Sequence, residues 1–464
     1  MKYTGNLFLI GNFFSAGASI FQGKTMTFIE SVGGVDFGKK DVAKAELLYS
    51  ADMINIMGDV GKITPSSKTQ LLSEIFESTQ DFSAVAKKFS GATKASQLMK
   101  TSTLHFITSM AEHYIQNTLM YSFLQGIKLK NRDGKYINKK GEVVDSRDKA
   151  MSLHEAYKVE KDPKGKKAAR LSLPNIDNQG SFELKGGMEI SLVNKNGVPD
   201  LKQAEFKVKR YLNHLNRRLN GNYTSNNQAL AQRHAAGKLA MMLRKWLEPG
   251  VRRRYRGLST ALIPNDALTA EDLYYNREIE DLDEGTYVTT TRFMAQLIRD
   301  YKNFSLEMTS DNWSQLTLRE KANIKKTITE VTTVIISALV SGLLYGAAQD
   351  EPDEKKKYAL MLGAFYTRRL YSELTFYVNP METLRILKSP AASMSLIQSG
   401  MEVFQQLGSD MLSVSAGGEF ERYEQGKRKG QMKLAKEFRD LVPIWYQTGR
   451  KIDEALGFLY KPMK

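Results

Sequence analysis

Apolar residues recur at intervals of three and four along most of the chain, the spacing that places them on one face of an α-helix. The pattern is continuous between residues 41 and 127, and it returns from residue 200 onward. In the second stretch, one face is formed by Ala204, Val208, Tyr211 and Leu215. The pattern therefore predicts a mainly α protein made of helical bundles.

Between residues 128 and 199 the pattern changes to short alternating runs separated by glycine turns. The turns at 132–134, 139–141 and 185–187 each end in glycine, and apolar and polar residues alternate in runs such as 182–184 and 188–190. Alternation places successive side chains on opposite faces of a strand, and glycine adopts the backbone conformations of tight turns. We therefore expect a charged insertion that contains small β-hairpins.

The rest of the chain divides into two further helical regions. A helical run at 226–247 is ended by Pro249 and Gly250, and seven Asp and Glu follow between 271 and 284. We expect four regions in chain order: a helical N-terminal region at 1–127, the hairpin insertion at 128–199, a basic helical region with an acidic loop at 200–288, and a C-terminal helical bundle with one long apolar helix at 289–464.

An uncharged stretch at 3–23 follows Lys2 and is similar in pattern to a signal peptide. Gly11 and Asn12 interrupt its apolar centre, and the stretch is rich in Gly and Ser. We therefore expect an interfacial or core segment, in a protein that is not secreted.

The long apolar helix is expected at 331–349, nineteen residues without a charge. At about 1.5 Å per residue this length approaches the roughly 30 Å thickness of a bilayer's hydrocarbon layer. Ala338, Gly342 and Gly346 recur at every fourth position, a spacing that lets helices pack closely in lipid. A buried helix of a large bundle has a similar pattern, so both interpretations stay open. A second uncharged run at 358–367 is too short to span a membrane alone.

Composition adds a strong positive charge to this picture. The 464 residues include 67 Lys and Arg against 51 Asp and Glu, a net charge of +16, which favours encounter with nucleic acid or an anionic membrane. Residues 201–257 hold fourteen cations and two Glu. The candidate nucleic-acid-binding residues in this basic stretch are Lys209, Arg210, Arg217, Arg218, Arg244, Lys245, Arg252, Arg253, Arg254 and Arg256. The alternatives are a solvated basic face, or pairing of these cations with the acidic loop around Asp281.

No motif points to catalysis. The chain has no Cys, and its five His are not spaced as metal ligands on one helical face. No phosphate-binding loop, nucleophile elbow or dinucleotide fingerprint is present. Residues 281–285 come nearest to an acidic metal centre, and we interpret them as a solvated turn. We therefore predict no metal, no cofactor and no enzymatic activity.

Several short segments in the basic stretch and after it are similar in sequence to segments of one known protein family. They include Asn222-Tyr223, 244–250 and 252–255, followed by 274–276 and 284–287. Over residues 200–294 the chain resembles the terminal regions of the very large virion proteins of crAss-like tailed bacteriophages. The resemblance implies a cargo or ejected protein that is packaged in the virion and delivered with the genome to the host cytoplasm or inner membrane. Its partners would be non-specifically bound nucleic acid, other virion proteins, or that membrane.

The longest members of that family also carry RNA polymerase modules. The acidic metal-binding motif of the polymerase is missing here, so polymerase activity is not carried over. The expected function is that of a non-enzymatic virion structural or cargo protein that contacts nucleic acid and a host membrane. The alternatives are an accessory segment of a larger virion polymerase-containing protein, or a membrane-associated bacterial protein.

Overall fold

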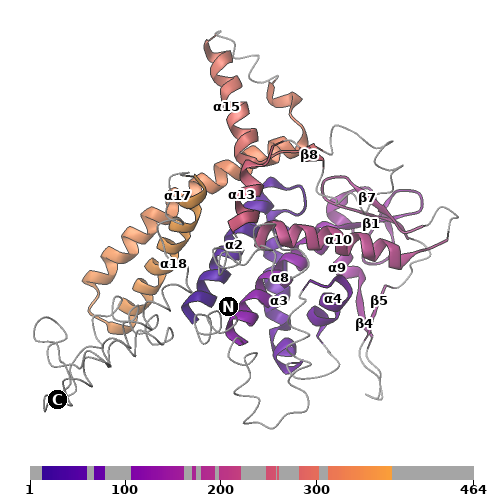
Figure 1. Ribbon diagram of the computed structural model, residues 1–464. Helices are drawn as coiled ribbons and strands as arrows, with labels where there is room; N and C mark the ends of the chain where they lie inside the picture. The colour runs from indigo at the N-terminus through magenta and orange to yellow at the C-terminus, as the bar shows by residue number, and fades with distance from the viewer. Residues whose placement is uncertain are drawn as a thin grey trace, which may run out of the picture.

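The protein is mainly helical and carries a small antiparallel sheet, as the sequence pattern predicts (Figure 1). The computed structural model describes residues 13–59, 67–78, 106–160, 170–173, 179–193, 198–220, 247–257, 259–260, 282–302 and 312–378.

The described residues of the N-terminal region form the helices α2 (Phe13–Gly33), α3 (Lys39–Asp59), α4 (Lys68–Phe76) and α8 (Phe106–Gly126). Helix α8 packs against both α2 and α3. Helix α4 begins where the Ser67 hydroxyl accepts a hydrogen bond from the Gln70 N–H, at 3.3 Å. It ends at Glu77, whose φ of 47° is left-handed and stops the helical hydrogen bonding.

The insertion forms a five-stranded antiparallel sheet in the order β3-β2-β1-β6-β7. Its strands are β1 (Lys128–Asn131), β2 (Tyr136–Ile137), β3 (Val143–Val144), β6 (Gln179–Glu183) and β7 (Glu189–Ser191). A single 3-10 turn at Arg147–Lys149, the short helix α9 (Leu153–Ala156) and the pair β4 (Lys158–Glu160) and β5 (Arg170–Ser172) lie between β3 and β6 in the chain.

The predicted glycine turns are confirmed. Gly134, Gly141 and Gly187 have φ values of 77°, 87° and 91°, which only glycine adopts without strain. Across the last of these turns, Phe182 pairs with Ile190. The alternating pattern therefore fixes the register, because a shift by one residue would turn Phe182 to the other face.

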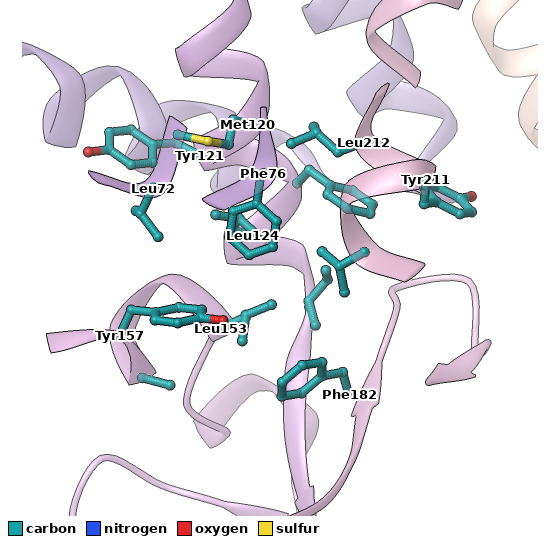
Figure 2. Close-up of a cluster of buried hydrophobic side chains, with 14 of the residues drawn as sticks. Leu72, Phe76, Met120, Tyr121, Leu124, Leu153, Tyr157, Phe182, Tyr211 and Leu212 are labelled. Atoms are coloured by element: carbon teal, nitrogen blue, oxygen red, sulfur yellow. The ribbon is translucent and has the colours of Figure 1, made fainter. Parts of the chain in front are cut away.

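The main core lies where α4, α8 and α10 (Leu201–Asn220) meet the sheet and α9 (Figure 2). Phe182 from the sheet is fully buried there, and the rings of Phe123 and Tyr211 stack at 5.2 Å. The predicted apolar face of α10 is buried in this core. One core therefore crosses the expected borders at 127 and 199, which mark changes in local structure and not separate folding units.

The C-terminal part of the described chain comprises α13 (Leu247–Tyr255), β8 (Ser259–Thr260), β9 (Leu282–Asp283), α15 (Thr286–Lys302), α17 (Leu318–Asp350) and α18 (Glu354–Val378). Helices α17 and α18 run side by side as a hairpin that projects from the rest of the molecule, and we call it the α17–α18 hairpin (Figure 1). Helix α17 begins with a capping box, in which Thr317 and Glu320 bond to each other's backbone N–H groups. Such a cap stabilises a helix by about 1 kcal/mol.

Helix α2 connects the two parts, since it packs against α8 on one side and against α17 and α18 on the other. A Cβ added at Gly17 would lie 2.3 Å from the Tyr366 hydroxyl, and one at Gly23 would lie 2.7 Å from Ile115. The glycines of the N-terminal uncharged stretch thus serve close helix packing, as expected for a core segment. Residues 3–12 of that stretch lie outside the described residues.

The acidic run at 281–285 differs from the expected solvated turn. Leu282 and Asp283 form strand β9, which pairs with β8, and Glu284 forms an ion pair with Arg292 at 3.0 Å. The carboxylate of Glu284 therefore pairs with a side chain of the same protein. The rest of the acidic loop, from 271 to 281, lies outside the described residues.

Candidate functional site

The basic stretch enters the structure through α10 and α13, and its cations divide between the surface and the interior. On α10, the Lys209 ammonium pairs with Glu77 at 2.6 Å, and the Arg210 guanidinium lies over the ring of Phe206. Arg217 and Arg252 are exposed and Arg256 is half-buried. Arg244 and Lys245 fall outside the described residues, so their predicted role stays a prediction.

Arg218 turns inward. Its Nη2 lies 2.6 Å from Glu30 and 2.9 Å from Asp36, two carboxylates that are almost fully buried. Asp36 also accepts a hydrogen bond from the Tyr211 hydroxyl at 2.5 Å, and Lys326 of α17 pairs with Glu30. Burial alone would raise the pKa of Glu30, but Arg218 and Lys326 outweigh it and lower that pKa to about 2. Glu30 is therefore ionised and binds two cations from different helices.

Arg254 is fully buried between α13, α17 and α18. Its Nε donates to Glu330 at 2.8 Å, its Nη1 donates to the Gly250 carbonyl at 2.7 Å, and its guanidinium lies 3.7 Å from the ring centre of Tyr377. The adjacent Arg253 donates to the sulfur of Met26 at 3.0 Å. Burial, followed by repulsion from Arg254, lowers the pKa of Arg253 to about 10.

Two of the predicted nucleic-acid contacts therefore need correction. A phosphate contact requires a guanidinium that solvent can reach, and the side chain of Arg254 is 0% exposed while that of Arg218 is 14% exposed. Both side chains lie in the protein interior, where a buried charge is tolerated only beside a group of opposite charge. Among the described residues their partners are Glu30, Asp36 and Glu330.

The apolar run at 331–349 forms the second half of α17, and it is largely unburied. Within the most apolar eighteen residues of this helix, 11% are buried. Leu339 and Leu343 are 62% and 74% exposed. The other large apolar side chains exposed along α17 from residue 328 onward are Ile328, Val331, Ile335, Ile336 and Tyr345. The interpretation as a buried bundle helix is therefore wrong for this half of α17 within the structure as described.

The first half of the same helix behaves differently. Ala322, Ile324, Lys326, Thr327 and Glu330 are all buried against neighbouring elements. Helix α17 is thus fixed at its base and exposed along its outer half (Figure 1).

The small residues Ala338, Gly342 and Gly346 do not make the contact with α18. All three are exposed, and a Cβ added at either glycine would meet no atom within 4 Å. The contact uses the opposite face, where the Ser341 hydroxyl donates to the Ala364 carbonyl at 3.2 Å and Leu344 lies against Gly363. The predicted packing role of the small stripe is therefore not fulfilled within the described hairpin.

The described residues contain no group of three or more His, Asp and Glu that could hold a metal ion. The buried histidines instead make structural bonds: Nδ1 of His113 lies 2.9 Å from the Tyr49 hydroxyl, and Nδ1 of His154 lies 3.0 Å from Nε2 of Gln125. Burial lowers the pKa of His113 to about 4 and that of His154 to about 3. Both rings are neutral at physiological pH.

The sequence interpretation missed the acids that hold the inward cations. Glu30 is the only acidic residue of α2, and Glu330 directly precedes the apolar run of α17. A single carboxylate within a mostly apolar helical segment is a usable signal, because such a group is rarely buried without a partner. No protein-family model, no curated protein and no solved structure matches this chain.

Proposed function

We propose that this chain is a non-enzymatic structural or ejection protein of a tailed-phage virion, and that its α17–α18 hairpin is the element that enters a membrane. The observation that carries the membrane role is the exposed apolar half of α17, with Leu339 and Leu343 among its most exposed side chains. The virion setting rests on the resemblance of residues 200–294 to virion proteins of crAss-like phages.

Transfer of these side chains into hydrocarbon is favourable. Full burial of a Leu or Ile side chain contributes about 1.5–3 kcal/mol, and α17 exposes several of them in succession. The backbone of a helix satisfies its own hydrogen bonds, which is a requirement for any segment in lipid. The nineteen uncharged residues at 331–349 span about 28 Å, close to the hydrocarbon thickness.

Charges bound the apolar segment at both ends. Lys326 and Glu330 are held in the ion pairs at the base, whereas Asp350, Asp353 and Glu354 lie at the turn between the helices. This arrangement supports insertion of the outer half alone, with the base remaining in the folded body.

The nucleic-acid contact rests on the net charge of +16 and on the exposed part of the basic stretch. Arg217 and Arg252 are exposed, so they are the described candidates for phosphate contact. Arg218 and Arg254 are excluded from it by their burial.

The deciding experiment is flotation of the full chain with phosphatidylglycerol-containing vesicles at low and at 1 M salt. We expect the protein to float at both, because apolar insertion is not screened by salt. The variant Leu339→Asn/Leu343→Asn should reduce the floated fraction by about tenfold or more, from the lost apolar transfer. The matched control is Ile54→Asn/Phe206→Asn, which changes two exposed apolar residues on other helices and should float like the parent.

A parallel arm measures electrophoretic shift of duplex DNA with the same protein. DNA binding that weakens steeply with salt, and further in Arg217→Ala/Arg252→Ala, supports the nucleic-acid contact. Protein that neither floats nor shifts DNA overturns the proposal, as does equal loss of flotation in the hairpin and control variants.

A further inference from the structure

A cavity of about 460 Å³ lies between α3, α4, the end of α8, α9 and β4, on the side of the molecule away from the α17–α18 hairpin. Figure 1 shows α3, α4 and α9 side by side with β4 and β5. None of its lining residues belongs to the basic stretch or to the apolar helix. The cavity is therefore separate from the candidate nucleic-acid contacts and from the proposed membrane element.

Four lysines line this cavity: Lys44 on α3, Lys68 on α4, Lys158 on β4, and Lys139 in the turn between β2 and β3. The single carboxylate in the lining is Glu155. One oxygen of Glu155 pairs with Lys139 at 3.0 Å, and the other accepts the Ser152 N–H at 3.1 Å as part of the cap of α9. Both oxygens of Glu155 thus already have partners. Lys44, Lys68 and Lys158 have no other carboxylate in the lining to pair with.

Lys68 is the most enclosed of these three. Its Nζ donates to the His154 carbonyl at 2.7 Å, and it makes no ion pair with any described residue. Burial lowers the pKa of Lys68 to about 8, although Glu155 and Asp52 act in the opposite direction. A positive charge that is poorly solvated and lacks an acidic partner gains strongly from an anion placed beside it.

Lys44 and Lys158 are exposed at the edge of the cavity, and neither makes an ion pair with a described residue. Lys128 lies close enough to Lys44 to act on it electrostatically, which adds to the positive field. Cations at an open edge with a further cation inside form a gradient that draws an anion inward.

Gln125 supplies a neutral polar group at the inner wall. Its side chain is 1% exposed and its Oε1 has no hydrogen-bond partner, while its Nε2 bonds to Nδ1 of His154. If the amide turns over and His154 donates, Nε2 becomes the unpaired donor instead. In that orientation the unpaired atom is a donor, which is what a phosphate oxygen requires, and a buried polar atom without a partner is rare in folded proteins.

We propose that this cavity binds a phosphate group, with Lys44, Lys68 and Lys158 as its cationic ligands and Gln125 as a polar contact. The lining contains lysine and no arginine, which fits a compact, multiply charged phosphate better than the planar carboxylate that arginine matches. Leu48 and Met151 also line the cavity, so they offer an apolar wall for the carbon skeleton attached to the phosphate.

A phosphate of this kind is present in free phosphomonoesters and in anionic lipid headgroups. The first arm therefore titrates the full chain with glycerol phosphate and with inorganic phosphate in a calorimeter. The second arm measures binding to phosphatidylglycerol vesicles, with phosphatidylcholine vesicles as reference. This arm uses the variant Leu339→Asn/Leu343→Asn, so that the hairpin contributes little and the result does not depend on the proposed membrane role.

The variant Lys44→Ala/Lys158→Ala should weaken binding by about tenfold or more in whichever arm binds, because each lysine contributes a charge-assisted bond to phosphate. Both side chains are exposed, so the fold should be retained. The control Lys40→Ala/Lys207→Ala removes the same charge from exposed positions outside the cavity and should bind like the parent.

Lys68→Met keeps the apolar stem of the inner lysine and removes its charge, and it should also weaken binding. Binding in the calorimeter assigns the site to a free phosphate, and binding to phosphatidylglycerol vesicles alone assigns it to a headgroup. Absence of binding to every probe at millimolar concentration overturns the proposal, and so does equal weakening in the cavity and control variants.

Discussion

Around Phe182 the large apolar side chains are enclosed by their own chain (Figure 2), whereas along the outer half of α17 side chains of the same kind are exposed. Phe182 and Leu119 are 0% exposed, and Leu339 and Leu343 are more than 60% exposed. Both regions are apolar in sequence and regular in backbone. The difference shows that apolar composition indicates which segments favour burial. It does not indicate whether the protein itself or another partner buries them.

The two regions also differ in how they use charge. The N-terminal core is enclosed by apolar contacts, while the base of the hairpin is held by ion pairs that Glu30 and Glu330 make with Arg218, Lys326 and Arg254. Buried ion pairs contribute little net stability but are costly to break, because one charge is then left without a partner. The hairpin is thus attached to the folded body at a defined place and orientation, with its apolar length outside.

The largest effect is expected from truncation in the core compared with truncation on the hairpin. Phe182→Ala should lower the free energy of unfolding by about 3–5 kcal/mol, through lost burial and a residual cavity. Leu343→Ala, at a side chain that is 74% exposed, should change it by less than about 0.5 kcal/mol in detergent-free solution. Urea denaturation of the full chain measures both. A loss of several kcal/mol at Leu343 would show that a protein surface covers the hairpin in solution, and would break the comparison.

A somewhat smaller effect is expected at the base of the hairpin. Glu330→Gln leaves Arg254 buried without a carboxylate and should cost about 3 kcal/mol of the free energy of unfolding. Glu74→Gln removes a carboxylate from an exposed position on α4, and it should cost less than about 0.5 kcal/mol. If both variants unfold at the same urea concentration, the pair does not hold the base of the hairpin.

Much of the fold could be predicted from the sequence because its signals are local. The glycines at 134, 141 and 187 mark their turns without reference to distant residues, and the buried face of α10 follows from helical spacing. The ion pairs are not local: Arg218 and Glu30 are 188 positions apart, and Lys326 and Glu30 are 296 apart. Cation density alone therefore predicted a surface role for residues that the fold turns inward.

The candidate sites show the same limit. Spacing identified Ala338, Gly342 and Gly346 as neighbours on one face of a helix, but it did not indicate that α18 would pack on the other face. The three lysines proposed to bind phosphate lie on α3, α4 and β4, so Lys44 and Lys158 are more than a hundred positions apart in the sequence. A site assembled from several elements becomes recognisable only after the chain has folded.

The smallest effect per side chain is expected on acidification, and it distinguishes the N-terminal region from the hairpin. His113 and His154 are buried in the N-terminal region, whereas the sequence from 318 to 378 contains no histidine. Burial, the main cause, lowers the pKa of His113 to about 4 and of His154 to about 3, and Lys68 adds to the effect at His154 while Glu155 opposes it. The unfolded chain takes up these protons near pH 6.5, before the folded chain does, so the free energy of unfolding falls as pH drops from about 6.5 toward 4.

Each histidine should account for about 2 kcal/mol of that loss between pH 7 and pH 4.5, since one unit of pKa difference corresponds to about 1.4 kcal/mol. Urea denaturation at pH 7, 5.5 and 4.5 measures the slope of the free energy of unfolding against pH. His113→Gln should reduce this slope, because the variant lacks one group that takes up a proton on unfolding. Flotation of the folded protein with vesicles should change little over the same range, because the apolar segment at 331–349 contains no histidine and no acidic residue. A slope that is unaffected by His113→Gln would show that groups other than His113 cause the acid sensitivity between pH 7 and 4.5.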